Sequence, residues 1–219
     1  MENARSGILK GTTTVGVVFK NGVVLAADKR ASAQTFIASK VAKKLHPISD
    51  RIVVSISGLV ADAQVLVRWM QGELRKFSIS RERQVLVSEA ANLLALVLHT
   101  NFKQLLPFMV HFLIGGVDVR GPHIFFLDHA GGANEEKYMS TGSGSPIALG
   151  VLEANFKRNM TENQAIKLAL KALRSAIRRD AATGDGIDLV VITPEQLRFL
   201  KPDEIDKHLS GLSKVFSEG

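Results

Sequence analysis

Cysteine is missing from this 219-residue chain, and tryptophan and tyrosine occur once each. Without cysteine there can be no disulfide bond, no thiol nucleophile and no thiolate-bound zinc. No apolar run reaches the roughly 18 residues that a membrane-spanning helix needs, and the opening residues, Met1 to Ser6, lack the apolar stretch of a secretory signal. We therefore expect a cytoplasmic protein that makes no contact with a membrane.

Motifs for metal and nucleotide chemistry are also absent from the sequence. The six histidines show no His-Glu-x-x-His or comparable ligand spacing, so structural or surface roles fit them better. The stretch from Thr141 to Ser145 resembles a phosphate-binding loop, but no Gly-Lys-Ser/Thr follows it, and Gly-x-Ser-x-Gly does not surround Ser143. We expect no metal and no cofactor, and we interpret 141–145 as a turn before a helix.

The positive charge of the chain raises the question of nucleic-acid binding. The formal net charge is +7 and the isoelectric point is near 9.8. The basic residues are scattered, however, and the densest groups have no interleaved aromatic residues on which bases could stack. These groups are Lys40, Lys43 and Lys44, and Arg174, Arg178 and Arg179. We interpret the charge as a solvated surface, not a nucleic-acid interface.

Hydrophobic periodicity divides the chain into clustered strands and clustered helices. Strand-like runs cover 13–19, 23–27, 51–57, 109–114, 124–127 and 189–193, and helical spacing covers 60–77, 87–106, 145–157 and 161–179. The last helix opens with a capping-box pattern at Thr161. Because strands and helices do not alternate strictly, the order predicts an α+β fold of one domain, with no linker or repeat. Two facing antiparallel sheets, each covered by a helix pair, would satisfy this order.

The first two strands are predicted to form a hairpin around Asn21-Gly22, a strong turn signal. If Lys20 to Gly22 form a three-residue loop, counting outward places Thr14 opposite Asp28. Thr12 then shares their face of the sheet.

A run of three threonines, in Gly11-Thr12-Thr13-Thr14-Val15-Gly16, is the most informative segment. Taken alone, it is typical of the start of a strand. Five further segments accompany it, in a fixed order: Ala26 to Arg30, Lys43 to Leu45, Ser57 to Asp62, Ser140 to Ser145 and Arg179 to Gly186.

Together these segments resemble the β subunits of the proteasome, and the archaeal type in particular, which are N-terminal-nucleophile hydrolases. The resemblance runs from about Gly11 to Leu212, which is nearly the whole chain. It implies a four-layer αββα sandwich, in agreement with the order of elements.

The resemblance also implies a role for each matching residue. Thr12 would be the nucleophile, freed by cleavage of the Gly11–Thr12 bond, and Gly58 would supply the oxyanion-binding N–H. The neighbouring charged pair would be Asp28 and Lys44. The residues that orient the terminal amine would be Ser143, Asp180 and Thr183. The family usually has Ser at the position of Thr183, so one hydroxyl residue has replaced another.

This chemistry explains why a leading segment must be removed. A threonine hydroxyl needs a base within hydrogen-bond reach. A free α-amine, whose pKa is about 7.7–8.0, can act as that base near neutral pH, whereas an amide nitrogen cannot. We therefore expect residues 1–11 to be a propeptide removed by self-cleavage, and residues 12–219 to be the catalytic domain.

Specificity and partners also follow from the resemblance. The positions that match the primary substrate pocket are Ala31, Ala42, Ile56 and Val60. Because they are uncharged and mostly apolar, we expect a chymotrypsin-like preference for large apolar residues before the cut bond. The implied partners are other β subunits in a seven-membered ring, rings of α subunits, a regulatory ATPase and unfolded polypeptide substrates.

Two alternatives to an active proteasome subunit stay open at this point. One is a structural β-type subunit that assembles without cutting; such subunits would normally lack Thr12, Lys44 or the Gly11–Thr12 junction, all of which are present. The other is the two-ring bacterial relative, which the helix from Asp62 and the segment from Arg179 to Gly186 fit less well.

Overall fold

The computed structural model describes residues 11–33 and 36–213 and contains two five-stranded antiparallel sheets. The first has the strand order β10-β1-β2-β11-β12 and the second the order β5-β6-β7-β8-β9. The first sheet consists of β1 (Thr13–Phe19), β2 (Gly22–Asp28), β10 (Tyr138–Gly142), β11 (Ile187–Ile192) and β12 (Leu197–Phe199). The second consists of β5 (Leu45–Ser49), β6 (Ile52–Gly58), β7 (Val110–Asp118), β8 (Gly121–Leu127) and β9 (Ala133–Glu136). A small hairpin pairs β3 (Ala31–Ala33) with β4 (Phe36–Ser39).

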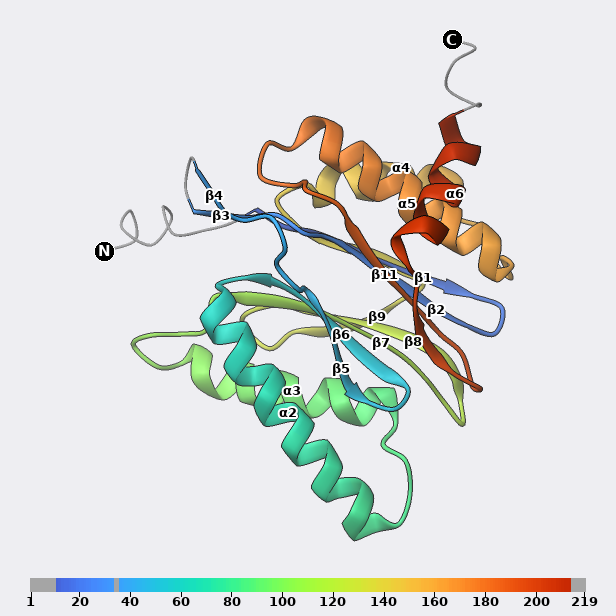
Figure 1. The fold of residues 1–219 in the computed structure, drawn as a ribbon. Coiled ribbons are helices and arrows are strands. Elements are labelled where there is room, and N and C mark those ends of the chain that lie inside the picture. Colours follow the sequence, from blue (N-terminus) through green and yellow to red (C-terminus); the bar gives the residue numbers. More distant parts are fainter. Residues whose placement is uncertain (1–10, 34–35, 214–219) are drawn as a thin grey trace.

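Helices cover the outer face of each sheet, which makes four layers (Figure 1). The helices α4 (Ser145–Asn155) and α5 (Glu162–Arg179) pack on the first sheet, and α6 (Pro202–Ser213) packs on α5. The helices α2 (Val60–Arg81) and α3 (Val87–Phe102) pack on the second. The expected α+β sandwich of two antiparallel sheets flanked by helices is confirmed.

The apolar pattern of β2 explains how the layers are held together. Successive side chains of a strand point to opposite faces, and all seven residues of β2 are buried. Val24 and Ala26 face the core under α4 and α5, whereas Val23, Leu25 and Ala27 face the core between the sheets. The strand is therefore apolar on both sides because it is covered on both sides.

The predicted register of the first hairpin is wrong by one residue. Phe19 pairs with Gly22 across a two-residue turn, so Thr14 lies opposite Ala27 and not opposite Asp28. Gly22 is the first residue of β2, and only glycine fits there because a Cβ would lie 2.2 Å from the carbonyl oxygen of Ile192. A one-residue shift moves each side chain to the other face. Asp28 consequently lies alongside Thr13.

Helices begin and end at residues with identifiable capping features. The expected capping box is present at the start of α5, where the Thr161 hydroxyl accepts a hydrogen bond from the Gln164 N–H at 3.3 Å. The helix α2 extends beyond the expected residue 77 and ends before Glu82, which has a left-handed conformation (φ 50°). Within the described residues, no helix is both long and apolar enough to span a membrane.

Candidate active site

Thr12 lies immediately before β1, at one end of the sandwich, and is buried (6% exposed). The chain continues through the Gly11–Thr12 peptide bond, and the Thr12 hydroxyl donates a hydrogen bond to the carbonyl oxygen of Gly11 at 2.6 Å. A Cβ on Gly11 would lie 1.9 Å from the carbonyl oxygen of Ala182. Only glycine fits at this junction as it stands, so the residue before Thr12 is fixed by packing.

Lys44 and Asp28 form a buried ion pair beside this junction. The Lys44 ammonium donates to Asp28 Oδ1 at 2.7 Å, to the Arg30 carbonyl at 2.6 Å and to the Gly11 carbonyl at 3.2 Å. All three N–H groups of the ammonium therefore have an acceptor. Burial lowers the pKa of Lys44 from its ordinary value, and the charge and hydrogen bond of Asp28 oppose this effect.

Backbone amides complete the surroundings of the Asp28 carboxylate, which is fully buried. Its Oδ1 accepts from the Thr13 N–H at 2.8 Å, and its Oδ2 accepts from the N–H groups of Gly184 and Arg30 at 2.9 and 3.1 Å. Four donors on one buried carboxylate distinguish this pair from a surface ion pair, whose contribution is at most about 1 kcal/mol.

The other three expected polar residues form one hydrogen-bond chain. Asp180 Oδ2 accepts from the hydroxyls of Ser143 at 2.6 Å and Thr183 at 2.5 Å. Because Thr183 gives its only hydroxyl hydrogen to the carboxylate, the Thr13 hydroxyl must donate to Thr183, at 2.7 Å. Ser143 Oγ also lies 3.4 Å from the Thr12 carbonyl oxygen. Thr183 thus makes its contacts through the hydroxyl group, which is the group it shares with Ser.

Gly58 ends β6 one residue before the N-cap of α2. Its φ of +107° is in the region that favours glycine, and a Cβ would lie 2.3 Å from the Met109 carbonyl oxygen. A helix N-terminus carries unpaired N–H groups and a partial positive charge. The backbone around Gly58 therefore suits a developing negative charge.

The four expected pocket residues line a single cavity of about 330 Å³. These are Ala31, Ala42, Ile56 and Val60, and the same cavity is lined by Gly11, Thr12, Lys44 and Gly58. The expected substrate-pocket positions and the expected catalytic positions thus open on the same space.

Comparison with known proteins supports the sequence motifs and the fold. A family model described as "Proteasome subunit" matches residues 8–192, which is most of the chain. This chain belongs to the proteasome subunit family.

Archaeal relatives named "Proteasome subunit beta" match it almost from end to end. The relative from Methanocorpusculum labreanum is 47% identical over 210 residues, covering 95% of this chain and 98% of the relative. That from Archaeoglobus profundus is 46% identical over 209 residues, covering 95% and 96%. That from Methanocaldococcus vulcanius is 47% identical over 203 residues, covering 92% and 90%.

Within this proteasome-family site, three contributors were not found by sequence reasoning. The Arg30 carbonyl and the Gly184 N–H hold Lys44 and Asp28 through the backbone, and the Thr13 hydroxyl begins the chain to Asp180. The Arg30 guanidinium also anchors the loop after α5, donating to Asp185 Oδ2 at 2.7 Å and to the Ala181 carbonyl at 2.7 Å. The hydrogen bond to Asp185 raises the pKa of Arg30.

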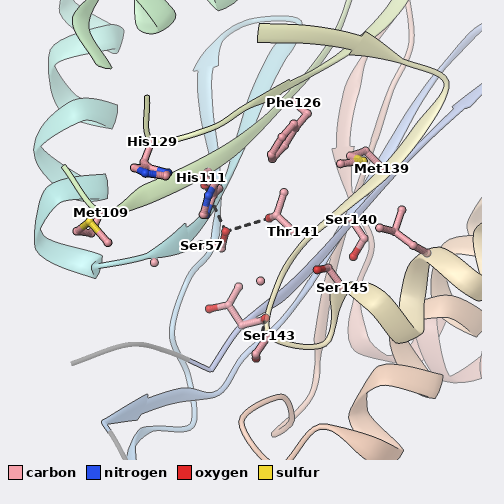
Figure 2. Close-up of a pocket in the computed structure, with 14 residues that line it drawn as sticks. Ser57, Met109, His111, Phe126, His129, Met139, Ser140, Thr141, Ser143 and Ser145 are labelled. Atoms are coloured by element: carbon pink, nitrogen blue, oxygen red, sulfur yellow. Dashed lines mark hydrogen bonds between the residues drawn. The ribbon is translucent and has the colours of Figure 1, made fainter. Parts of the chain in front are cut away.

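A second cavity of about 560 Å³ also borders Thr12 (Figure 2). Ser57, next to Gly58, donates to the Thr141 hydroxyl at 3.0 Å, and Thr141 lies 2.7 Å from the Thr14 hydroxyl. These contacts join the two sheets beside the cavity. Among the described residues, no cluster of three or more His, Asp and Glu could hold a metal ion.

Proposed function

We propose that the chain is a threonine endopeptidase of the 20S proteasome core, made as a precursor whose residues 1–11 are removed by self-cleavage. The observation that carries this proposal is the Thr12 hydroxyl, which lies against the Gly11 carbonyl while Lys44 donates to the same oxygen. Nucleophile, carbonyl and positive charge are together at the bond that must break.

Self-cleavage would begin with an acyl shift. Thr12 Oγ adds to the Gly11 carbonyl carbon, the Gly11–Thr12 C–N bond breaks, and the proton lost by the hydroxyl ends on the released Thr12 nitrogen. Water then hydrolyses the Gly11–Thr12 ester and leaves a free α-amine. Positioning a nucleophile against its target in this way replaces a bimolecular encounter.

Peptide hydrolysis would use the amine that self-cleavage releases. The amine takes the proton of the Thr12 hydroxyl, Oγ adds to the substrate carbonyl, and the Gly58 N–H stabilises the oxyanion. The leaving amine takes the proton and departs, and water then hydrolyses the acyl ester with the α-amine as base. Lys44 favours ionisation of the hydroxyl, while Ser143, Asp180 and Thr183 orient the amine.

The first prediction concerns Thr12 in particles expressed from residue 12 onward together with α subunits. Thr12→Ala removes the attacking oxygen but keeps an amine, so rings should assemble with peptidase activity at background. Thr12→Ser keeps the hydroxyl and should hydrolyse small peptides substantially. The measurement is turnover of a fluorogenic apolar peptide by size-verified particles. Near-normal turnover by intact Thr12→Ala rings would refute the mechanism and favour a structural subunit.

The second prediction concerns the residue before the cut bond. Burying a large apolar side chain contributes about 1.5–3 kcal/mol, so Leu, Phe or Tyr should be favoured tenfold or more over Asp or Glu in kcat/KM. Lys43, which also lines the smaller cavity, is exposed and should pair only weakly with an acidic residue. Faster cleavage after Asp or Glu would contradict the chymotrypsin-like assignment.

The proposal includes the setting in which the enzyme works. As a β-type subunit, the chain would form seven-membered rings between rings of α subunits in the cytoplasm, with a regulatory ATPase feeding unfolded polypeptide to the chamber. The similarity to archaeal β subunits over nearly the full length of both chains supports this assembly.

A further inference from the structure

The larger cavity shares Thr12, Ser57 and Gly58 with the smaller one. It contains none of the four pocket residues expected from the sequence. A substrate held at Thr12 therefore has two different spaces available, one for each side of the bond being cut.

The position of Gly11 indicates which cavity receives which side of the cut bond. Gly11 lines the smaller cavity and does not line the larger one. In self-cleavage Gly11 provides the acyl group, so the smaller cavity holds the acyl side. The larger cavity is then left for the residues that follow the cut bond, on the leaving-group side.

Aromatic side chains form one wall of the larger cavity, where Figure 2 shows His111, Phe126 and His129 together. They come from β7, from β8 and from the turn after β8. His111 and Phe126 are stacked with ring centroids 6.1 Å apart, and His111 meets His129 edge to face at 5.6 Å. All three residues are half-buried. A further ring could extend this cluster in the same geometries.

The remaining walls combine apolar side chains with uncharged hydroxyl groups. The apolar ones are Met109, Met139 and Leu149, and thioethers adapt to aromatic rings. The hydroxyl groups belong to Thr12, Ser57, Ser140, Thr141, Ser143 and Ser145. Of the described residues lining this cavity, none is Asp, Glu, Lys or Arg. A charged substrate side chain would lose its hydration there, and a basic one would gain no acidic partner.

We propose that the larger cavity selects a large aromatic side chain at the first or second position after the cut bond, and that His111, Phe126 and His129 determine this preference. The proposal rests on the endopeptidase function proposed above. It concerns the leaving-group side alone and is independent of the preference at the acyl side.

The test uses assembled, processed particles and internally quenched peptides that keep Leu before the cut bond. Phe, Trp, Asp and Lys are placed in turn at each of the first two positions after it. We expect Phe or Trp to exceed Asp and Lys about tenfold or more in kcat/KM at one of these positions. Flat profiles at both positions, in particles that cleave the peptides, would overturn this proposal and leave the endopeptidase function intact.

Variants then assign the preference to the ring wall. Phe126→Ala should reduce the aromatic preference to less than threefold, with Phe126→Leu intermediate. The inhibition constant of a tripeptide aldehyde, which occupies only the acyl side, should not change. Phe199→Ala, at an exposed position of β12, is the matched control and should keep the preference. An unchanged preference in Phe126→Ala would refute the assignment to this wall. Particles that neither cleave peptides nor bind the aldehyde would refute both proposals.

Discussion

At the scale of single residues, the site is held by charged groups whose hydrogen-bond donors and acceptors are matched. Asp28 and Asp180 each gather several donors, and Lys44 has an acceptor for each N–H. Buried charges arranged in this way hold neighbouring groups in one geometry, but they contribute to stability only while every partner is present. Substitutions here therefore affect both folding and chemistry, and experiments have to separate the two.

The Lys44–Asp28 pair allows that separation. Lys44→Ala leaves the buried Asp28 carboxylate without its cation, so we expect about 3–5 kcal/mol lower stability and turnover reduced by orders of magnitude. The double variant Lys44→Met with Asp28→Asn removes both charges at similar volume and should recover much of the stability. Its turnover should stay at background, because no positive charge remains beside Thr12.

Chemical denaturation and peptide turnover of the same assembled particles measure the two effects. Lys43→Ala is the control, because its exposed side chain adjoins Lys44 in sequence. If turnover returned together with stability in the double variant, Lys44 would have a structural role only.

At the scale of secondary-structure elements, the sequence predicted those with a strong apolar pattern. The strands β1, β2, β6 and β7 were found because they are short runs rich in apolar and β-branched residues, and the four long helices because their apolar residues repeat with the helical period. The strand β4 was missed because it is largely exposed and has no apolar alternation. The strand β10 was missed because two of its central residues, Ser140 and Thr141, are polar although they are buried.

The same limit applies to the site. The charged and hydroxyl residues stand in recognisable motifs, so their positions could be predicted from the family resemblance. The Arg30 carbonyl and Gly184 N–H are backbone groups that carry no residue-type signal. The aromatic wall of the larger cavity combines His111 of β7 with Phe126 and His129 of β8 and the turn after it, and the antiparallel pairing of β7 with β8 brings them together.

The junction between β6 and α2 can be tested by substituting Gly58. Gly58→Ala places a Cβ where the Met109 carbonyl oxygen lies 2.3 Å away, at a φ of +107°. We expect a cost of about 1–3 kcal/mol in stability, and a displaced N–H that lowers kcat about 100-fold. Gly72→Ala is the control, because it lies inside α2 with no atom within 4 Å of the added Cβ. It should stabilise the chain by roughly 0.5–1 kcal/mol and leave kcat unchanged. Equal kcat in the two variants would exclude Gly58 as an oxyanion donor.

At the scale of the whole molecule, the two sheets and the loop after α5 meet at the Gly11–Thr12 junction. Lys44 approaches from the segment before β5, Ala182 from the loop after α5, and Thr12 continues into β1. Three parts of the chain, distant in sequence, must be in place before the junction has its geometry. If the chain cleaves itself as proposed, the reaction is therefore expected to follow folding of the chain.

The junction itself can be tested by adding one methyl group. In Gly11→Ala the Cβ would lie 1.9 Å from the backbone oxygen of Ala182, so the loop or the junction must shift and the Thr12 hydroxyl loses its position against the carbonyl. Because misplacement by about 1 Å can cost 100-fold in rate, we expect assembled Gly11→Ala particles to retain residues 1–11 for much longer than the unchanged chain. Intact-mass measurement at timed intervals after mixing with α subunits would show this.

Two comparisons identify the cause of such a delay. Gly150→Ala, in α4 with open space around the added Cβ, should be processed at the normal rate. A chain expressed directly from Thr12 lacks residue 11 and should form fully active particles, so a defect limited to Gly11→Ala would lie in self-cleavage and not in peptide hydrolysis. If Gly11→Ala were processed as fast as Gly150→Ala, the close approach of Ala182 would not control the reaction, and the junction would have to rearrange before it is cut.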